Sequence, residues 1–144
     1  MRGFFHSNSF FLDKDFKTRE ECLEFLTDQA VQGGYMDEQS KQSVFEREQL
    51  SSTAVGSLAA LPHAMDTEHV KSNISVLTLQ KPIPWGDMQV QIVFLLTIEQ
   101  EKSALWEKVF LRLYHFIKDG NGAEQMRKIR DFEQFMNLFA EVIP

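Results

Sequence analysis

A histidine that directly follows a proline is the residue of this chain best suited to chemistry. Leu61, Pro62 and His63 stand in succession, and proline both fixes its own φ and biases the residue before it toward extended geometry. We therefore expect a strand end or turn that aims an imidazole outward. Because an unperturbed imidazole has a pKa of about 6.5, the neutral ring can act as a nucleophile near pH 7 without a separate base.

Residues upstream of His63 carry groups that could bind phosphate. Phosphoryl transfer depends on in-line positioning and on stabilising the charge of the phosphate oxygens, for which a guanidinium and hydroxyl donors are suited. Arg47 is the candidate cation, and Ser51, Ser52 and Thr53 are the candidate hydroxyl donors. The alternative is structural: Arg47 would pair with a glutamate on its own surface, and the hydroxyls would cap turns.

The order of motifs around these residues resembles a known family. Residues 47–56 read Arg-Glu-x-Leu-x-Ser-Thr-x-x-Gly, and an apolar run then leads into Pro62, His63 and Ala64. This pattern is similar to the phosphorylation-site region of the mannitol/fructose-type (type 2) enzyme IIA domains of the bacterial sugar phosphotransferase system (PTS). The resemblance implies that His63 accepts a phosphoryl group on a ring nitrogen close to Arg47. Which of the two nitrogens reacts stays open.

Two further motifs resemble one version of this domain. Residues 81–86 read Lys-Pro-Ile-Pro-Trp-Gly and residues 90–96 are apolar except for Gln91, as in the enzyme IIA-like domain near the C-terminus of PRD-containing transcription antiterminators and related regulators. The resemblance implies that residues 1–144 form one enzyme IIA type 2 domain of a larger regulator, in which phosphorylation of His63 reports sugar availability. The implied partners are phosphorylated HPr or enzyme IIB, together with PRD or other regulatory domains of the same chain.

One departure from the mannitol-type transport enzymes concerns a second histidine. Those enzymes carry another active-site histidine just before the helix that follows the long central strand, and the matching position here lies near Ser103. His115 is a full helix away beside an apolar stripe, so we expect it to be partly buried and structural. The departure suits a regulatory variant better than a transport enzyme.

Three other functions remain open. A stand-alone enzyme IIA would relay phosphate from HPr to a sugar-specific enzyme IIB, and modules encoded upstream of Met1 would distinguish a regulator from it. An interaction domain that is never phosphorylated would keep its partner affinities after His63→Ala. A metal hydrolase would use His63, Asp66 and His69, but no HExxH or CxxC spacing supports it. We predict no metal and no cofactor, and a phosphohistidine carrier rather than a turnover enzyme.

Composition narrows the class of protein. With 144 residues, 43% of them hydrophobic and 25% charged, the chain can bury the core of one globular domain. A net charge of −6 without a basic patch argues against direct contact with nucleic acid. The single Cys22 excludes an intrachain disulfide, and no signal peptide or apolar run of about 18 residues is present. We therefore expect a cytoplasmic protein without membrane insertion.

Capping residues and apolar periodicity predict the elements that position these groups. Helices are expected over residues 18–32, 37–49, 102–117, 123–128 and after Asp131. Strands are expected over residues 10–12, within 54–61, over 73–79 and over 90–98, and the last of these reads as a central strand covered on both faces. The fold class is therefore α/β. The resemblance implies a mixed β-sheet sandwiched between helices.

Several local expectations can be checked against a structure. Pro82, Pro84 and Gly86 predict a loop. The helix ending near residue 49 is expected to bury Val44, Phe45 and Leu50, and the helix over residues 102–117 is expected to bury Leu105. Trp85 could flank the site or pack at the edge of the sheet, and we expect the packing role. Leu61 and Met65, if exposed beside His63, would suit docking of a partner protein.

Overall fold

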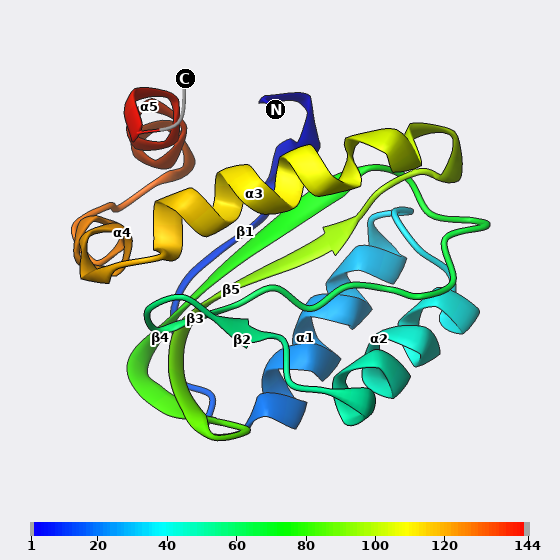
Figure 1. Cartoon of the computed structure of the whole chain (residues 1–144), viewed down its shortest axis with the longest axis horizontal. Coiled ribbons are helices and arrows are strands. Elements are labelled where there is room, and N and C mark those ends of the chain that lie inside the picture. Colours follow the sequence, from blue (N-terminus) through cyan, green and yellow to red (C-terminus); the bar gives the residue numbers. More distant parts are fainter. Residues whose placement is uncertain (1, 143–144) are drawn as a thin grey trace.

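A five-stranded mixed sheet in the order β1-β4-β5-β3-β2 forms the centre of the computed structural model, which describes the backbone of residues 2–142 and the side chains of residues 3–139 (Figure 1). Strands β1 and β4 are parallel, β4 and β5 antiparallel, β5 and β3 parallel, and β3 and β2 antiparallel. The strand bounds are Phe5–Lys14 (β1), Ala54–Val55 (β2), Ala59–Ala60 (β3), Asn73–Trp85 (β4) and Met88–Thr97 (β5).

Helices cover both faces of this sheet. Helices α1 and α2 lie on one side, and α3, α4 and α5 lie on the other (Figure 1). Their bounds are Arg19–Gln32 (α1), Glu38–Leu50 (α2), Trp106–Ile117 (α3), Gly120–Met126 (α4) and Phe132–Val142 (α5), with 3-10 turns at Arg2–Phe4 (η1) and Gln100–Leu105 (η2). The predicted mixed sheet between helices is confirmed. No helix in the described part of the chain is long and apolar enough to cross a membrane.

Three helices begin at capping residues that the sequence predicts. Thr18, Asp37 and Asp131 each use a side-chain oxygen to accept a hydrogen bond from the backbone amide three residues later, at 3.1, 2.8 and 2.8 Å. These bonds satisfy donors that have no partner within the first helical turn. The start of each helix is therefore determined locally, which is why the sequence alone predicts it.

The central strand β5 divides the core in two. Val93 and Leu95 face the cluster under α1 and α2, while Phe94 and Leu96 face the cluster under α3, α4 and α5. Every residue of β5 from Val90 onward is buried. Because both faces are covered, the strand is apolar almost throughout rather than alternating, and the prediction for residues 90–98 is confirmed.

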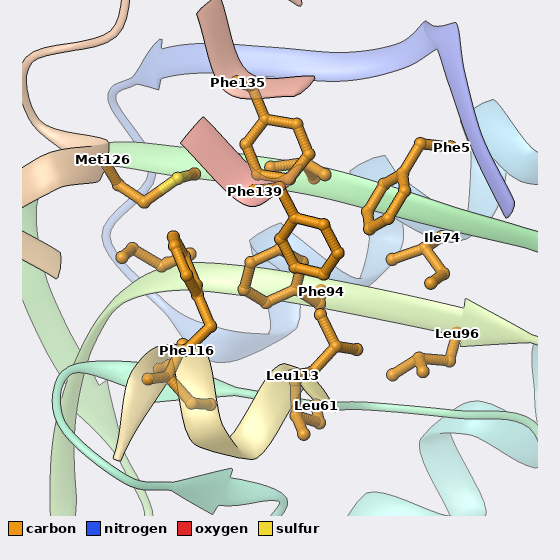
Figure 2. Close-up of a cluster of buried hydrophobic side chains, with 14 of the residues drawn as sticks. Phe5, Leu61, Ile74, Phe94, Leu96, Leu113, Phe116, Met126, Phe135 and Phe139 are labelled. Atoms are coloured by element: carbon orange, nitrogen blue, oxygen red, sulfur yellow. The ribbon is translucent and has the colours of Figure 1, made fainter. Parts of the chain in front are cut away.

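Phenylalanine rings fill the cluster between the sheet and α5. Phe5 of β1 packs edge-on against Phe135 and Phe139 of α5, with ring centroids 5.2 and 5.0 Å apart. Figure 2 shows these rings together with Phe94 of β5 and Phe116 of α3. Edge-to-face aromatic pairs add a favourable term to the burial of apolar area. This cluster fixes α3 and α5 against the sheet.

The loop predicted at Pro82 and Pro84 is wrong, because β4 continues through both prolines to Trp85. The β1 partner ends where Lys14 pairs with Leu79, so beyond that point β4 has only β5 beside it. A proline lacks an N–H donor and is tolerated where a strand has an unpaired side. The chain turns instead at Gly86, whose φ of +62° suits glycine.

Four further expectations need correction. Leu50 is 74% exposed and Leu105 is 38% exposed, because α2 turns its final residue to solvent and Leu105 belongs to η2 rather than to α3. His115 is exposed rather than partly buried. Helix α4 begins at Gly120, three residues before the predicted start, because Asp119 caps it. Val44 is buried, as predicted, whereas Phe45 is only partly buried.

Candidate functional site

His63 lies just beyond β3, attached to the end of the central strand. It forms an isolated parallel bridge with Leu96, and the Leu96 amide donates a 3.0 Å hydrogen bond to the carbonyl of Pro62. The segment before it is buried: Leu61 is only 1% exposed, so it does not meet the condition of exposure under which it would suit docking. Met65, on the other side of His63, is 47% exposed.

Helix α2 holds the segment that follows His63. The hydroxyl oxygen of Ser43 accepts hydrogen bonds from the backbone amides of Met65 and Asp66, both at 3.0 Å, and donates to the carbonyl of Ser40 at 2.7 Å. Together with the bridge to Leu96, these bonds fix the backbone on both sides of the histidine. His63 is therefore presented by a rigid segment.

The orientation of the His63 ring follows from two contacts. Nδ1 lies 3.0 Å from the carbonyl oxygen of Leu61, and the ring packs edge-on against Trp106 with centroids 4.8 Å apart. A carbonyl oxygen can only accept a hydrogen bond, so Nδ1 carries the proton. Nε2 then carries the free electron pair, which identifies it as the nucleophilic nitrogen of the neutral ring.

His63 lines a pocket of about 180 Å³. Its walls combine apolar side chains with two hydroxyl-bearing residues, Thr67 and Ser103. The pocket residues are His63, Ala64, Thr67, Leu96, Ile98, Ser103 and Trp106. In the transport enzymes that the sequence resembles, a second histidine is expected near Ser103, and Ser103 does line the same pocket as His63. Thr67 carries no motif that marks it in the sequence.

Burial is the main influence on the pKa of His63. Partial removal of the ring from water lowers its pKa below the usual value, and the charge of Arg47 lowers it further. The hydrogen bond to Leu61 and the charge of Glu48 act in the opposite direction and raise it. The net lowering favours the neutral ring near pH 7, which is the form that can attack phosphorus.

Arg47 stands in the last turn of α2 and is held by a hydrogen bond rather than by an ion pair. Its Nη1 donates to the carbonyl oxygen of Ser51 at 2.7 Å. Among the described residues no carboxylate lies within ion-pair distance of it, so the alternative in which Arg47 pairs with a surface glutamate has no support. Its positive charge remains available to an anion near His63.

The three candidate hydroxyl donors do not line the His63 pocket. Ser51 contributes its carbonyl to Arg47, and the Ser52 hydroxyl accepts a 3.2 Å hydrogen bond from the amide of Ala54. The Thr53 side chain is buried, and its hydroxyl lies 2.5 Å from Oε1 of Glu48. Ser52 therefore fits the alternative in which the hydroxyls cap turns. The Thr53 hydroxyl already donates its one proton to the Glu48 carboxylate.

Glu48 is a second residue near the site that sequence reasoning missed. It is 4% exposed, and besides the Thr53 hydroxyl its carboxylate accepts hydrogen bonds from the Thr53 amide at 2.7 Å and from Nε1 of Trp85 at 3.0 Å. Trp85 itself is fully buried, which confirms its predicted packing role. The Arg-Glu pair in the motif was a signal for Glu48, but its burial depends on the distant β4–β5 hairpin.

The residues of the metal alternative are engaged elsewhere. His69 lies 3.2 Å from the Asp37 carboxylate, and Asp66 accepts hydrogen bonds from the Gln39 side chain and from the Glu68 amide. Within the described residues, no three histidine, cysteine or acidic side chains are grouped closely enough to hold a metal ion.

Comparison with known proteins shows where the sequence belongs. The family model described as "Phosphoenolpyruvate-dependent sugar phosphotransferase system, EIIA 2" matches residues 3–142. The chain is 33% identical over 129 residues to the probable licABCH operon regulator of Bacillus subtilis, and 27% identical over 127 residues to the transcriptional regulator ManR of the same organism. These matches take in 90% and 88% of this chain but 20% of each relative, so the chain spans about a fifth of their length.

The fold has a close counterpart among solved structures. A chain from the solution structure of the Escherichia coli complex of enzyme IIAMTL with phosphorylated enzyme IIBMTL superimposes with a TM-score of 0.82 at 21% identity, covering 95% of this chain and 99% of that one. At this identity the likeness concerns the fold alone. The family model covers nearly the whole chain, and the resemblance read from the motifs around His63 is thereby confirmed. The chain belongs to the EIIA 2 family of the phosphoenolpyruvate-dependent sugar phosphotransferase system.

Proposed function

We propose that Nε2 of His63 accepts a phosphoryl group from a phosphorylated carrier protein, the PTS protein HPr in the first instance. The observation that supports this most strongly is the 3.0 Å contact between Nδ1 and the Leu61 carbonyl, which leaves Nε2 unprotonated on a residue that lines a pocket. The donor is the one implied by the family to which the chain belongs.

The transfer needs no base from this chain. As the bond between phosphorus and the donor nitrogen breaks, the donor ring leaves with its electron pair, and the lone pair of Nε2 forms the new bond to phosphorus. The His63 ring then carries a phosphoryl group on Nε2 and keeps its proton on Nδ1, so the ring is formally a cation. The Leu61 carbonyl accepts a stronger hydrogen bond from that cation than from the neutral ring.

The groups around the pocket are suited to bind the phosphoryl oxygens. The charge of Arg47 already lowers the pKa of His63, and among the described residues no carboxylate forms an ion pair with Arg47. Thr67 and Ser103 add hydroxyl donors from the pocket wall. Ser51 and Ser52 stay secondary candidates because they lie on the turn that Arg47 spans, whereas Thr53 would have to give up its bond to Glu48.

The role that we propose for the phosphorylated domain is regulatory. Two relatives are a probable operon regulator and a transcriptional regulator, each about five times as long as the matched region. Residues 1–144 would then be one domain of a cytoplasmic regulator. The charge added at His63 would change contacts with neighbouring regulatory domains, a local electrostatic event with a distant effect.

A transport role is the second candidate. It is favoured by one observation: a solved protein with the same fold is an enzyme IIA in a complex with phosphorylated enzyme IIB. In that role His63 would pass its phosphoryl group to an enzyme IIB instead of retaining it as a signal. Net transfer from the phosphorylated domain to enzyme IIB proteins of the same organism would favour transport.

Phosphate incorporation tests the proposal. Wild type, His63→Gln and the matched control His115→Gln, which removes an exposed histidine from α3, are incubated with enzyme I, HPr and phosphoenolpyruvate. Intact mass is then measured under alkaline conditions that preserve phosphohistidine. One phosphate is expected on wild type and His115→Gln and none on His63→Gln. Equal incorporation in all three proteins would refute the assignment to His63.

A further inference from the structure

Glu48 is an acidic residue in a position that is unfavourable for a carboxylate. It lies in the last turn of α2, where the helix dipole disfavours negative charge, and it is 4% exposed. Burying a carboxylate costs free energy unless donors surround it. Three donors do so here, from Thr53 and Trp85. A glutamine would fit the same space without the cost of a buried charge, so the charge itself calls for an explanation.

A chain of hydrogen bonds leads from this carboxylate to the reactive ring. The Thr53 amide donates to Oε2 of Glu48 at 2.7 Å. The Thr53 carbonyl in turn accepts from the Leu61 amide at 3.0 Å, and the Leu61 carbonyl accepts from Nδ1 of His63 at 3.0 Å. Each of the two linking residues is buried. Displacement of Glu48 would therefore shift the carbonyl that orients the imidazole.

The charges of the Arg-Glu pair act on His63 in opposite directions. Arg47 disfavours a positive ring, and Glu48 favours it. Before transfer the ring is neutral, whereas after transfer it is formally a cation that bears an anionic phosphoryl group. Arg47 can then stabilise the phosphoryl oxygens while Glu48 stabilises the ring. The two neighbouring residues thus have separate electrostatic roles in the product.

We propose that Glu48 is a positioning residue for His63: its buried carboxylate fixes, through Thr53 and Leu61, the carbonyl that receives the Nδ1 proton, and its charge favours the cationic ring of the phosphorylated product. This inference rests on the proposed function of His63. If Glu48 served only to hold α2 against the β4–β5 hairpin, it would stabilise the fold but would not influence the charge state of the His63 ring.

Two substitutions distinguish the effect of the Glu48 charge from the effect of its hydrogen bonds. Glu48→Gln keeps the shape: its amide oxygen can accept from the Thr53 amide and from Trp85, and its amide nitrogen can donate to the Thr53 hydroxyl. Glu48→Ala removes both charge and hydrogen bonds. Glu46→Gln is the matched control, because it removes the same charge from an exposed position on the same helix.

The readouts are the ¹⁵N chemical shifts of the His63 ring as a function of pH, and the rate of phosphate uptake from phosphorylated HPr. Glu48→Gln should keep the Nδ1-protonated tautomer, lower the pKa of His63, and reduce the saturating rate about tenfold with an unchanged KM for HPr. Glu48→Ala should give a mixture of tautomers and a loss of about 100-fold. Glu46→Gln should match wild type.

The outcomes distinguish this inference from the proposed function. Wild-type titration and rate in Glu48→Gln would overturn the inference, even if Glu48→Ala does not fold. If a folded Glu48→Ala protein keeps the wild-type ¹⁵N shifts of the His63 ring, the claim that Glu48 orients the ring through Thr53 and Leu61 is overturned. If wild type takes up no phosphate on His63, the proposed function fails, while the ring titration still decides whether Glu48 orients and polarises His63.

Discussion

Replacing Trp85 by phenylalanine tests whether the Glu48 cluster contributes to stability as its geometry implies. The substitution removes the Nε1 donor that lies 3.0 Å from Oε2 of Glu48. A hydrogen bond to a charged acceptor contributes about 1.5–3 kcal/mol, and the smaller ring also leaves part of a fully buried site unfilled. We expect the free energy of unfolding to fall by about 3 kcal/mol. With a urea m-value of about 2 kcal/mol/M, the midpoint should drop by about 1.5 M.

A double-mutant cycle with Glu48→Gln identifies the source of this loss. A neutral acceptor makes a hydrogen bond contributing only about 0.5–1.5 kcal/mol, so Trp85→Phe should cost about 1 kcal/mol less in the Glu48→Gln background. Urea unfolding followed by far-UV circular dichroism gives all four free energies. Trp106→Phe, at a partly exposed tryptophan, is the control. Additive effects, or a loss below about 0.5 kcal/mol for Trp85→Phe, would refute the reasoning.

Three other perturbations have defined outcomes. Burial lowers the pKa of His63 in the folded state, so below about pH 6.5 the unfolded chain binds more protons than the folded chain. The free energy of unfolding should therefore fall by up to about 1.4 kcal/mol per pH unit as the pH drops below that value. Urea titrations at pH 7 and pH 5 measure this loss of stability, which should be smaller in His63→Gln than in wild type. Arg47→Gln should raise the pKa of His63, measured by NMR, and slow phosphate uptake about 100-fold; an unchanged rate would remove Arg47 from the site. Gly122→Ala would place a Cβ 1.9 Å from the Phe116 carbonyl oxygen and should cost about 3 kcal/mol in thermal unfolding, whereas wild-type stability would show that α4 can shift freely.

Features that depend on local chemistry could be predicted from the sequence. Thr18, Asp37 and Asp131 cap helices through bonds within one turn, and the nearly continuous apolar run over residues 90–98 indicates a strand covered on both faces. Pro82 was misread as part of a loop because its tolerance depends on where the neighbouring strand ends. That end is a property of the assembled sheet and leaves no mark in the local sequence.

The residues of the candidate site also fall into those that the local sequence predicts and those that depend on the assembled fold. His63 and Arg47 stand in an ordered motif and could be singled out from sequence. Thr67 and Ser103 reach the pocket only because separate segments converge on the end of β5. The burial of Glu48 is equally non-local, since Trp85 comes from a hairpin 37 residues away along the chain. The proposal that Nε2 reacts depends on the position of the Leu61 carbonyl beside Nδ1, which the sequence does not show.

The measurement that tests the central claim most directly is ¹⁵N and ³¹P NMR of the phosphorylated domain, prepared with ¹⁵N-labelled histidine. The geometry predicts a single phosphoryl group coupled to Nε2 of His63, with Nδ1 protonated and hydrogen-bonded as in the free protein. A phosphoryl group on Nδ1 of His63, or on any other residue, would contradict the account.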